Sequence, residues 1–100
     1  MKKKRQKEDK IKTSKTGQKV RFELTYPHAK EVFLAGTFNN WQPSHSLKSV
    51  GGGKWEAELT LTPGRYEYRF VVNGEWISDP NAKDFVPNPF GGVNSALEVQ

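Results

Sequence analysis

The sequence of 100 residues contains no cysteine and only one methionine, and it has no long hydrophobic run. The lack of cysteine excludes disulfides, thiolate metal sites and a cysteine nucleophile, and it fits a reducing compartment. No apolar segment follows the charged start, so a secretory signal is not predicted. No run approaches the roughly 20 apolar residues that cross a bilayer. We therefore expect a cytoplasmic protein with no membrane partner.

The formal net charge of +5 is unevenly distributed along the chain. Residues 1–19 hold nine basic and two acidic residues, a balance of +7, whereas residues 20–100 hold seven basic and nine acidic residues, a balance of −2. Because residues 1–18 have almost no apolar content, they are predicted to form a disordered basic arm. The arm could contact nucleic acid weakly, but we favour a solvated tail. Met1 and the arm favour a complete open reading frame or an engineered start.

Residues 19–100 are expected to form one domain with a sequence period of two. Alternate residues are apolar in segments 19–26, 54–61 and 65–72, a pattern typical of half-buried antiparallel strands. The inward residues would be Val20, Phe22, Leu24 and Tyr26, then Trp55, Ala57, Leu59 and Leu61, then Tyr66, Tyr68, Phe70 and Val72. Shorter strands are predicted at 31–36 and at 95–100, where Ala96, Leu97 and Val99 would be buried.

The breaks between these segments carry turn residues. Pro63 and Gly64 suit the two central positions of a type II turn, and Asn73-Gly74 is the strongest two-residue hairpin signal. No segment has a useful helical period. Strands at this short spacing predict an all-β antiparallel sandwich.

Two of the three tryptophans do not fit the alternation. Trp55 is in phase with the core residues of its strand, but Trp41 lies among turn residues, and Trp76 follows the Asn73-Gly74 turn by two residues. Both rings could cap the ends of the core. Alternatively they could form a platform, because the flat indole face suits the apolar C–H face of a pyranose ring. Polar groups at the edge would then bind the sugar hydroxyls.

Polar residues surround both rings, which is the composition expected of a sugar site. The local neighbours are Asn39, Asn40, Gln42, Asn73 and Glu75, and of these Asn40 is predicted to bind the sugar. Arg69 faces opposite to Tyr68 and Phe70, hence outward from the core. It could form a surface ion pair of little energetic value or donate hydrogen bonds beside the aromatic platform.

Three motifs in this order resemble a known family: EVFLAGTFNNW, PGRYEYRFVVNGEWISDP and FGGVNS. They are similar to the glycogen-binding module of AMP-activated protein kinase beta subunits. The wider group is carbohydrate-binding module family 48, also found at the N-terminus of isoamylases, pullulanases and glycogen branching enzymes. The resemblance covers about residues 18–100. It implies an immunoglobulin-like, early-set β-sandwich that binds α-1,4-linked glucan such as glycogen, starch or maltodextrin.

The resemblance also implies roles for individual residues. The two platform tryptophans of the family correspond to Trp41 and Trp76, and its sugar-binding basic residue corresponds to Arg69, here Arg in place of Lys. In the late loop, Phe90 takes the place of an aliphatic residue that contacts a glucose ring, and Asn94 matches an asparagine that binds hydroxyls. Gly92 stands where the family has Thr, so one hydrogen bond to the sugar would be missing or supplied by the backbone.

Other functions remain open at this stage. A glycosidase usually needs two carboxylates across a cleft, and Asp79, Asp84 and Glu75 show no such arrangement. His28 and His45 are isolated in predicted loops. We therefore predict no enzyme activity, no metal and no cofactor. The alternatives are a protein-interaction module whose glucan site has decayed, an accessory domain of a glycoside hydrolase family 13-type enzyme, and a single-strand binder. The expected partners are an α-glucan and a glycogen-metabolising enzyme or a kinase.

Overall fold

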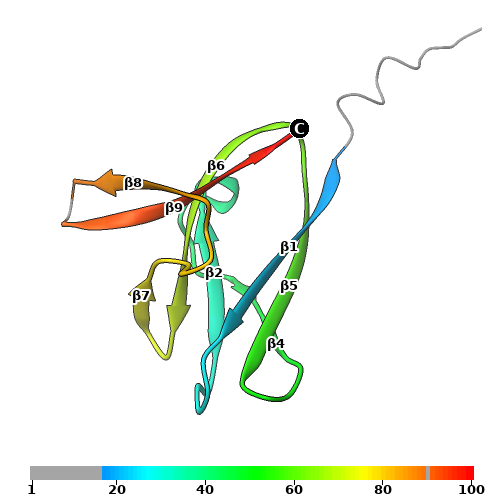
Figure 1. Ribbon diagram of the computed structural model, residues 1–100, viewed down its shortest axis with the longest axis vertical. Helices are drawn as coiled ribbons and strands as arrows, with labels where there is room; N and C mark the ends of the chain where they lie inside the picture. Colours follow the sequence, from blue (N-terminus) through cyan, green and yellow to red (C-terminus); the bar gives the residue numbers. More distant parts are fainter. Residues whose placement is uncertain (1–16, 90) are drawn as a thin grey trace, which may run out of the picture.

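The chain forms two antiparallel β-sheets that face each other (Figure 1). A computed structural model describes residues 17–89 and 91–100, so most of the predicted basic arm and Phe90 lie outside the described residues. The smaller sheet has the order β1-β5-β4 and contains β1 (Gln18–Thr25), β5 (Lys54–Leu61) and β4 (Lys48–Ser49). The predicted all-β antiparallel sandwich is confirmed.

The larger sheet has the order β3-β2-β6-β9-β8, and β7 also pairs with β6. Its strands are β2 (Val32–Gly36), β3 (His45–Ser46), β6 (Gly64–Val72), β7 (Glu75–Ile77), β8 (Asp84–Asn88) and β9 (Gly92–Val99). In the described part of the chain, the one helical element is the 3-10 turn η2 (Thr37–Asn39), and no helix there could cross a membrane. Strand β6 is central, because it pairs with β2, β7 and β9.

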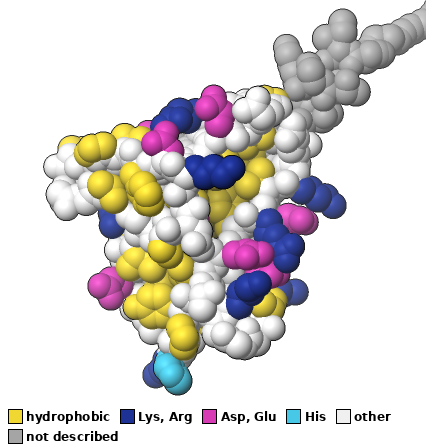
Figure 2. Space-filling view, in the orientation of Figure 1, with side chains coloured by type: hydrophobic (Ala, Val, Ile, Leu, Met, Phe, Trp, Pro, Cys, Tyr) yellow, Lys and Arg dark blue, Asp and Glu magenta, His cyan; other side chains and the backbone are white. Residues whose placement is uncertain are grey.

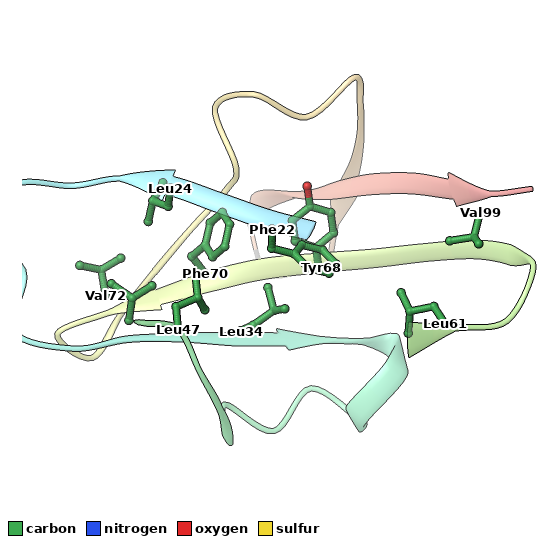
Figure 3. Close-up of a cluster of buried hydrophobic side chains, with 10 residues drawn as sticks. Phe22, Leu24, Leu34, Leu47, Leu61, Tyr68, Phe70, Val72 and Val99 are labelled. Atoms are coloured by element: carbon green, nitrogen blue, oxygen red, sulfur yellow. The ribbon is translucent and has the colours of Figure 1, made fainter. Parts of the chain in front are cut away.

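The core lies between the two sheets and follows the predicted alternation closely. Its buried residues come from both sheets and include Phe22, Leu24, Leu34, Leu47, Leu61, Tyr68, Phe70, Val72 and Val99 (Figure 3). The rings of Phe22 and Tyr68 meet edge to face, with their centroids 5.0 Å apart. Ala96 is buried and Leu97 packs against the core, as the sequence predicts for the last strand.

Several expected core residues are less buried than the alternation predicts. Tyr26 is exposed, so the prediction that it faces inward is wrong. The pairing of β1 with β5 ends at Thr25, and the chain then turns, so the period of two no longer fixes the direction of the next side chain. Trp55 is half-buried and packs against the core cluster.

Three strands have no counterpart in the sequence prediction. Strands β3 and β4 have two residues each, and they pair with different sheets on either side of the buried Leu47. Such short strands give too few positions for a pattern to be seen. Strand β8 contains Pro87, which argues against a strand in the sequence. Its place at the sheet edge makes the missing N–H tolerable.

The two predicted turns have different outcomes. Asn73 and Gly74 have φ angles of 50° and 87° and join the paired strands β6 and β7, as expected for a two-residue hairpin. Pro63 and Gly64 do not join paired strands, because β5 belongs to the smaller sheet and β6 to the larger one. This turn is a corner between the sheets.

The β8–β9 hairpin extends beyond the smaller sheet. Phe85 pairs with the fully buried Ser95, and Pro87 pairs with Val93, so all four share the core side of the larger sheet. Phe85 and Val93 are nevertheless 44% and 39% exposed, because the three-stranded sheet does not reach over them. Figure 2 shows hydrophobic side chains at this hairpin and also around β7.

A buried hydrogen bond attaches the loop after β7 to the core. The Tyr68 hydroxyl donates to Asp79 Oδ2 at 2.6 Å, and both residues are buried. The Asp79 N–H donates to Ser95 Oγ, and Asp79 Oδ1 accepts from the N–H of Asn81. Burial, together with the bond to Asp79, raises the pKa of Tyr68 above its ordinary value.

We predict that Tyr68→Phe lowers the free energy of unfolding by about 1 to 3 kcal/mol, because the buried Asp79 carboxylate loses a donor. The raised pKa adds a pH effect: stability is complete below the unfolded-state pKa of about 10 and falls as the pH rises above it. Urea unfolding at several pH values measures both effects. Tyr26→Phe, at an exposed position, should change neither. Equal pH profiles for Tyr68→Phe and the unaltered protein would contradict the assignment.

Candidate functional site: an aromatic depression on the outer sheet face

A depression of about 450 Å³ lies on the outer face of the larger sheet, away from the core. Its walls come from η2 and the following loop, from β6, β7 and β9, and from the end of β8. The lining residues are Thr37, Trp41, Glu67, Arg69, Trp76, Asn88, Pro89 and Asn94. Of the seven residues predicted from the sequence, Trp41, Arg69, Trp76 and Asn94 line it. Gly92 lies beside Arg69, and Phe90 is outside the described residues.

Trp41 is positioned by a tight turn after β2. The Asn39 side chain closes this turn, because its Oδ1 accepts from the Gly36 N–H at 2.9 Å and its Nδ2 donates to the Leu34 carbonyl at 3.2 Å. Asn40 and Trp41 follow with φ angles of 57° and 61°. Left-handed backbone at a tryptophan is costly and is found mainly where function requires it.

Gly36 at the start of this turn must lack a side chain. A Cβ there would lie 2.5 Å from the Glu67 carbonyl oxygen and 2.7 Å from the Phe38 ring. The Trp41 N–H donates to the Gly36 carbonyl at 2.8 Å. The close approach of the turn to β6 therefore places Trp41 beside the outward residues of that strand.

Trp76 reaches the same depression from β7. It lies directly across from Val71 of β6 and is 39% exposed. A ring that capped the core would be covered more completely, so the capping role considered for Trp76 does not fit its position. The hairpin at Asn73-Gly74 fixes its register against β6.

Arg69 lines the same depression as the two tryptophans, on the outward face of β6 as its sequence phase predicts. Its Nη2 donates to the Trp76 carbonyl at 3.3 Å. Among the described residues, its Nε is buried without a hydrogen-bond partner, and no carboxylate forms an ion pair with it. The surface ion pair considered for Arg69 is therefore absent from the described structure.

The polar edge of the depression is a chain of three side chains. Asn88 Nδ2 donates to Asn94 Oδ1 at 3.2 Å, and Asn94 Nδ2 donates to Glu67 Oε1 at 3.1 Å. Asn94 is only 9% exposed, so its hydrogen bonds hold the Glu67 and Asn88 side chains in place. Glu67 was not predicted, although its position two residues before Arg69 puts both on one strand face. Asn88 and Thr37 carried no recognisable signal.

Several polar neighbours of the tryptophans shape turns and lie outside the depression. Asn40 was predicted to bind sugar, but it is exposed and absent from the lining. Its left-handed φ of 57° explains the residue type, because asparagine tolerates this conformation. Asn73 Oδ1 accepts from the N–H groups of Lys30 and Glu31, which fixes the neighbouring loop.

The acidic residues considered for catalysis do not line this depression. Glu67 is the one carboxylate among the described lining residues. Asp79 is buried against Tyr68, and Asp84 binds Arg65 at 2.8 Å, which lowers the pKa of Asp84. In the described part of the chain, no group of three His, Cys, Asp or Glu could hold a metal ion. Two indoles beside a few polar side chains give this depression the composition of a site for a small, partly apolar ligand.

Comparison with known families agrees with such a ligand site. The family described as "Glycogen recognition site of AMP-activated protein kinase" matches residues 18–100, and the chain belongs to this family. It is a glycogen-recognition domain, a non-catalytic glucan-binding module.

Curated relatives carry the domain within longer proteins. The chain is 37% identical to the beta-1 subunit of 5'-AMP-activated protein kinase from Sus scrofa over 71% of its length, which covers 56% of that relative. It is 40% identical to the chloroplastic PTST homolog 2 of Arabidopsis thaliana over 57% of its length, or 11% of the relative. The chain thus spans between about a tenth and just over half of these proteins.

Solved structures share the fold. An enterobactin esterase from Shigella flexneri superposes with a TM-score of 0.71 and 20% identity, over 83% of this chain and 30% of the esterase. A maltogenic amylase from S. marinus superposes with a TM-score of 0.65 and 25% identity, over 82% of this chain and 13% of the amylase. The same sandwich fold therefore occurs within these longer chains.

We predict that Asn39→Ala lowers the free energy of unfolding by about 1 to 2 kcal/mol, because two hydrogen bonds of the Trp41 turn are lost. The tryptophan fluorescence spectrum should shift as Trp41 moves. Asn40→Gly is the matched control, because glycine accepts left-handed backbone freely, and its effect should stay within about 0.5 kcal/mol. An equal loss in both variants would show that the Asn39 side chain does not hold the turn.

Proposed function

We propose that this domain binds α-1,4-linked glucan in the depression on the outer sheet face, with Trp41 and Trp76 as stacking platforms. The observation that carries the proposal is convergence. Residues 41, 69, 76 and 94 are far apart in the sequence, yet they line one depression. Trp76 is 39% exposed and shares this depression with Trp41, and an exposed apolar patch rimmed by polar residues is typical of a ligand-binding groove.

The proposed binding mode combines apolar stacking with hydroxyl recognition. The apolar face of a glucose ring covers an indole, and little side-chain entropy is lost because tryptophan has few rotatable bonds. Arg69 donates to hydroxyl oxygens, and Glu67 accepts from hydroxyl hydrogens through the oxygen that Asn94 leaves available. A helical glucan is curved, so it can contact both rings and the polar groups between them.

The proposal gives the domain a targeting role. The protein kinase beta subunits and the plant relative are longer than this chain. We propose that the domain brings a glycogen-metabolising enzyme or a kinase to the polymer. The cytoplasm is the proposed location, although the name of the plant relative shows that a protein with such a domain can be chloroplastic.

We predict that maltoheptaose and β-cyclodextrin quench the tryptophan fluorescence of the unaltered protein. Trp41→Ala and Trp76→Ala should each weaken binding about thirtyfold or more, as truncation of a central aromatic usually does. Calorimetric titration measures the affinities, and circular dichroism checks the fold. Tyr26→Ala, which removes an exposed aromatic outside the depression, should bind normally. Normal binding by both tryptophan variants would refute the platform, and no response to millimolar sugar by any protein would favour the decayed scaffold.

We further predict that glucan binding changes little between about 50 and 200 mM salt, since the ligand is neutral, whereas nucleic-acid binding would weaken steeply. Deletion of residues 2–15 should leave the retardation by glycogen in a native gel unchanged. A strong salt dependence that disappears with the deletion would show that the basic arm, and not the depression, is responsible for binding.

A further inference from the structure

We infer that Gly92 is a positioning residue for the site, because its missing side chain provides the space in which the Arg69 guanidinium lies. This inference rests on the proposed function, and it extends that function to a residue that would touch no sugar through a side chain. The geometry that carries it involves Gly92, Arg69 and Asn88.

The space at Gly92 is occupied by its neighbours. A Cβ at Gly92 would lie 3.4 Å from both Nη1 and Nη2 of Arg69 and 3.3 Å from Asn88 Nδ2. The approach to Asn88 is tighter than most Cβ contacts, and the two to Arg69 lie at the lower limit of ordinary van der Waals contact, so a side chain at this position would press on the amide and the guanidinium. Both groups line the depression.

The backbone at Gly92 gives no other reason for glycine. Gly92 is the first residue of β9 and pairs with Asn88, and its φ lies outside the left-handed range, unlike the φ of 92° at Gly91. An alanine would fit the strand backbone and would normally reduce the entropy of the unfolded chain. The requirement for glycine therefore comes from the side chains that face it.

No ion pair among the described residues orients Arg69, so packing beside Gly92 has to hold its guanidinium in place. The guanidinium has one hydrogen bond among the described residues, a long one to the Trp76 carbonyl at 3.3 Å, and its Nε is buried without a partner. A planar group with so few bonds keeps its orientation only if its faces are confined. Confinement beside Gly92 leaves other N–H groups of the guanidinium available to hydroxyls.

The test is a double-mutant cycle with Gly92→Ala and Arg69→Lys, followed by maltoheptaose titration. Gly92→Ala should weaken binding about tenfold by displacing the guanidinium, and Arg69→Lys should do the same because a single ammonium cannot make the paired hydrogen bonds of a planar guanidinium. The double variant should bind no more weakly than Arg69→Lys alone, because the slimmer lysine has no guanidinium to displace. Arg65→Lys on the same strand is the matched control. In an Arg65→Lys background, Gly92→Ala should weaken binding as much as it does in the unaltered protein.

Two results would overturn the inference: normal binding by Gly92→Ala, or independent effects that multiply in the double variant. Displacement of Asn88 as the true cause would also give multiplying effects. Thermal unfolding supplies a readout without sugar: Gly92→Ala should lower the Tm in the unaltered background and not in the R69K background. If neither the unaltered protein nor any variant binds glucan, the proposed function is refuted. The Tm values in the two backgrounds then still test whether Gly92 positions Arg69. Loss of folding by Gly92→Ala in both backgrounds counts against the inference.

Discussion

Strand β6 carries both the core and the candidate site, and the pairing of this one strand determines how the rest of the molecule is arranged. Its alternate residues Tyr68, Phe70 and Val72 are buried between the sheets. The intervening Glu67 and Arg69 line the depression on the other face. Because side chains alternate strictly along a strand, a slip of one residue would bury the charged pair and expose the aromatic ones. The apolar core therefore fixes the register of the site.

The strands that pair with β6 deliver several of the other site residues. Strand β2 leads into the turn that holds Trp41, β7 carries Trp76, and β9 carries Gly92 and Asn94. Features that weaken local stability lie at this place: left-handed backbone at Trp41, an exposed indole at Trp76 and the Nε of Arg69, which has no hydrogen-bond partner among the described residues. Such departures are expected where binding requires them and the surrounding sheet is strong enough to hold them.

The two faces of the larger sheet serve different purposes. One face packs against the smaller sheet, and its hydrophobic residues form the core. The other face bears the aromatic depression, and Glu67, Asn88 and Asn94 form its polar edge. The loop after β7 is attached to the core by the hydrogen bond between Tyr68 and Asp79, so the segment between Trp76 and β8 has a fixed path. Sandwiches of this fold occur within longer proteins.

The sequence by itself determined the sandwich, most of its core and the outward direction of Arg69, because a period of two is a local property that any strand shows. The motifs also indicated Trp41 and Trp76 as a pair. Only the tertiary structure decided that Asn40 lies outside the depression, that Asn94 holds Glu67 in place and that Tyr26 is exposed. Only the tertiary structure showed that Arg69, on another strand, lies next to Gly92. The sequence says that position 92 has no side chain, but it does not say which residue occupies the space. These relations depend on distances between strands remote in the sequence, and residue order does not encode such distances directly.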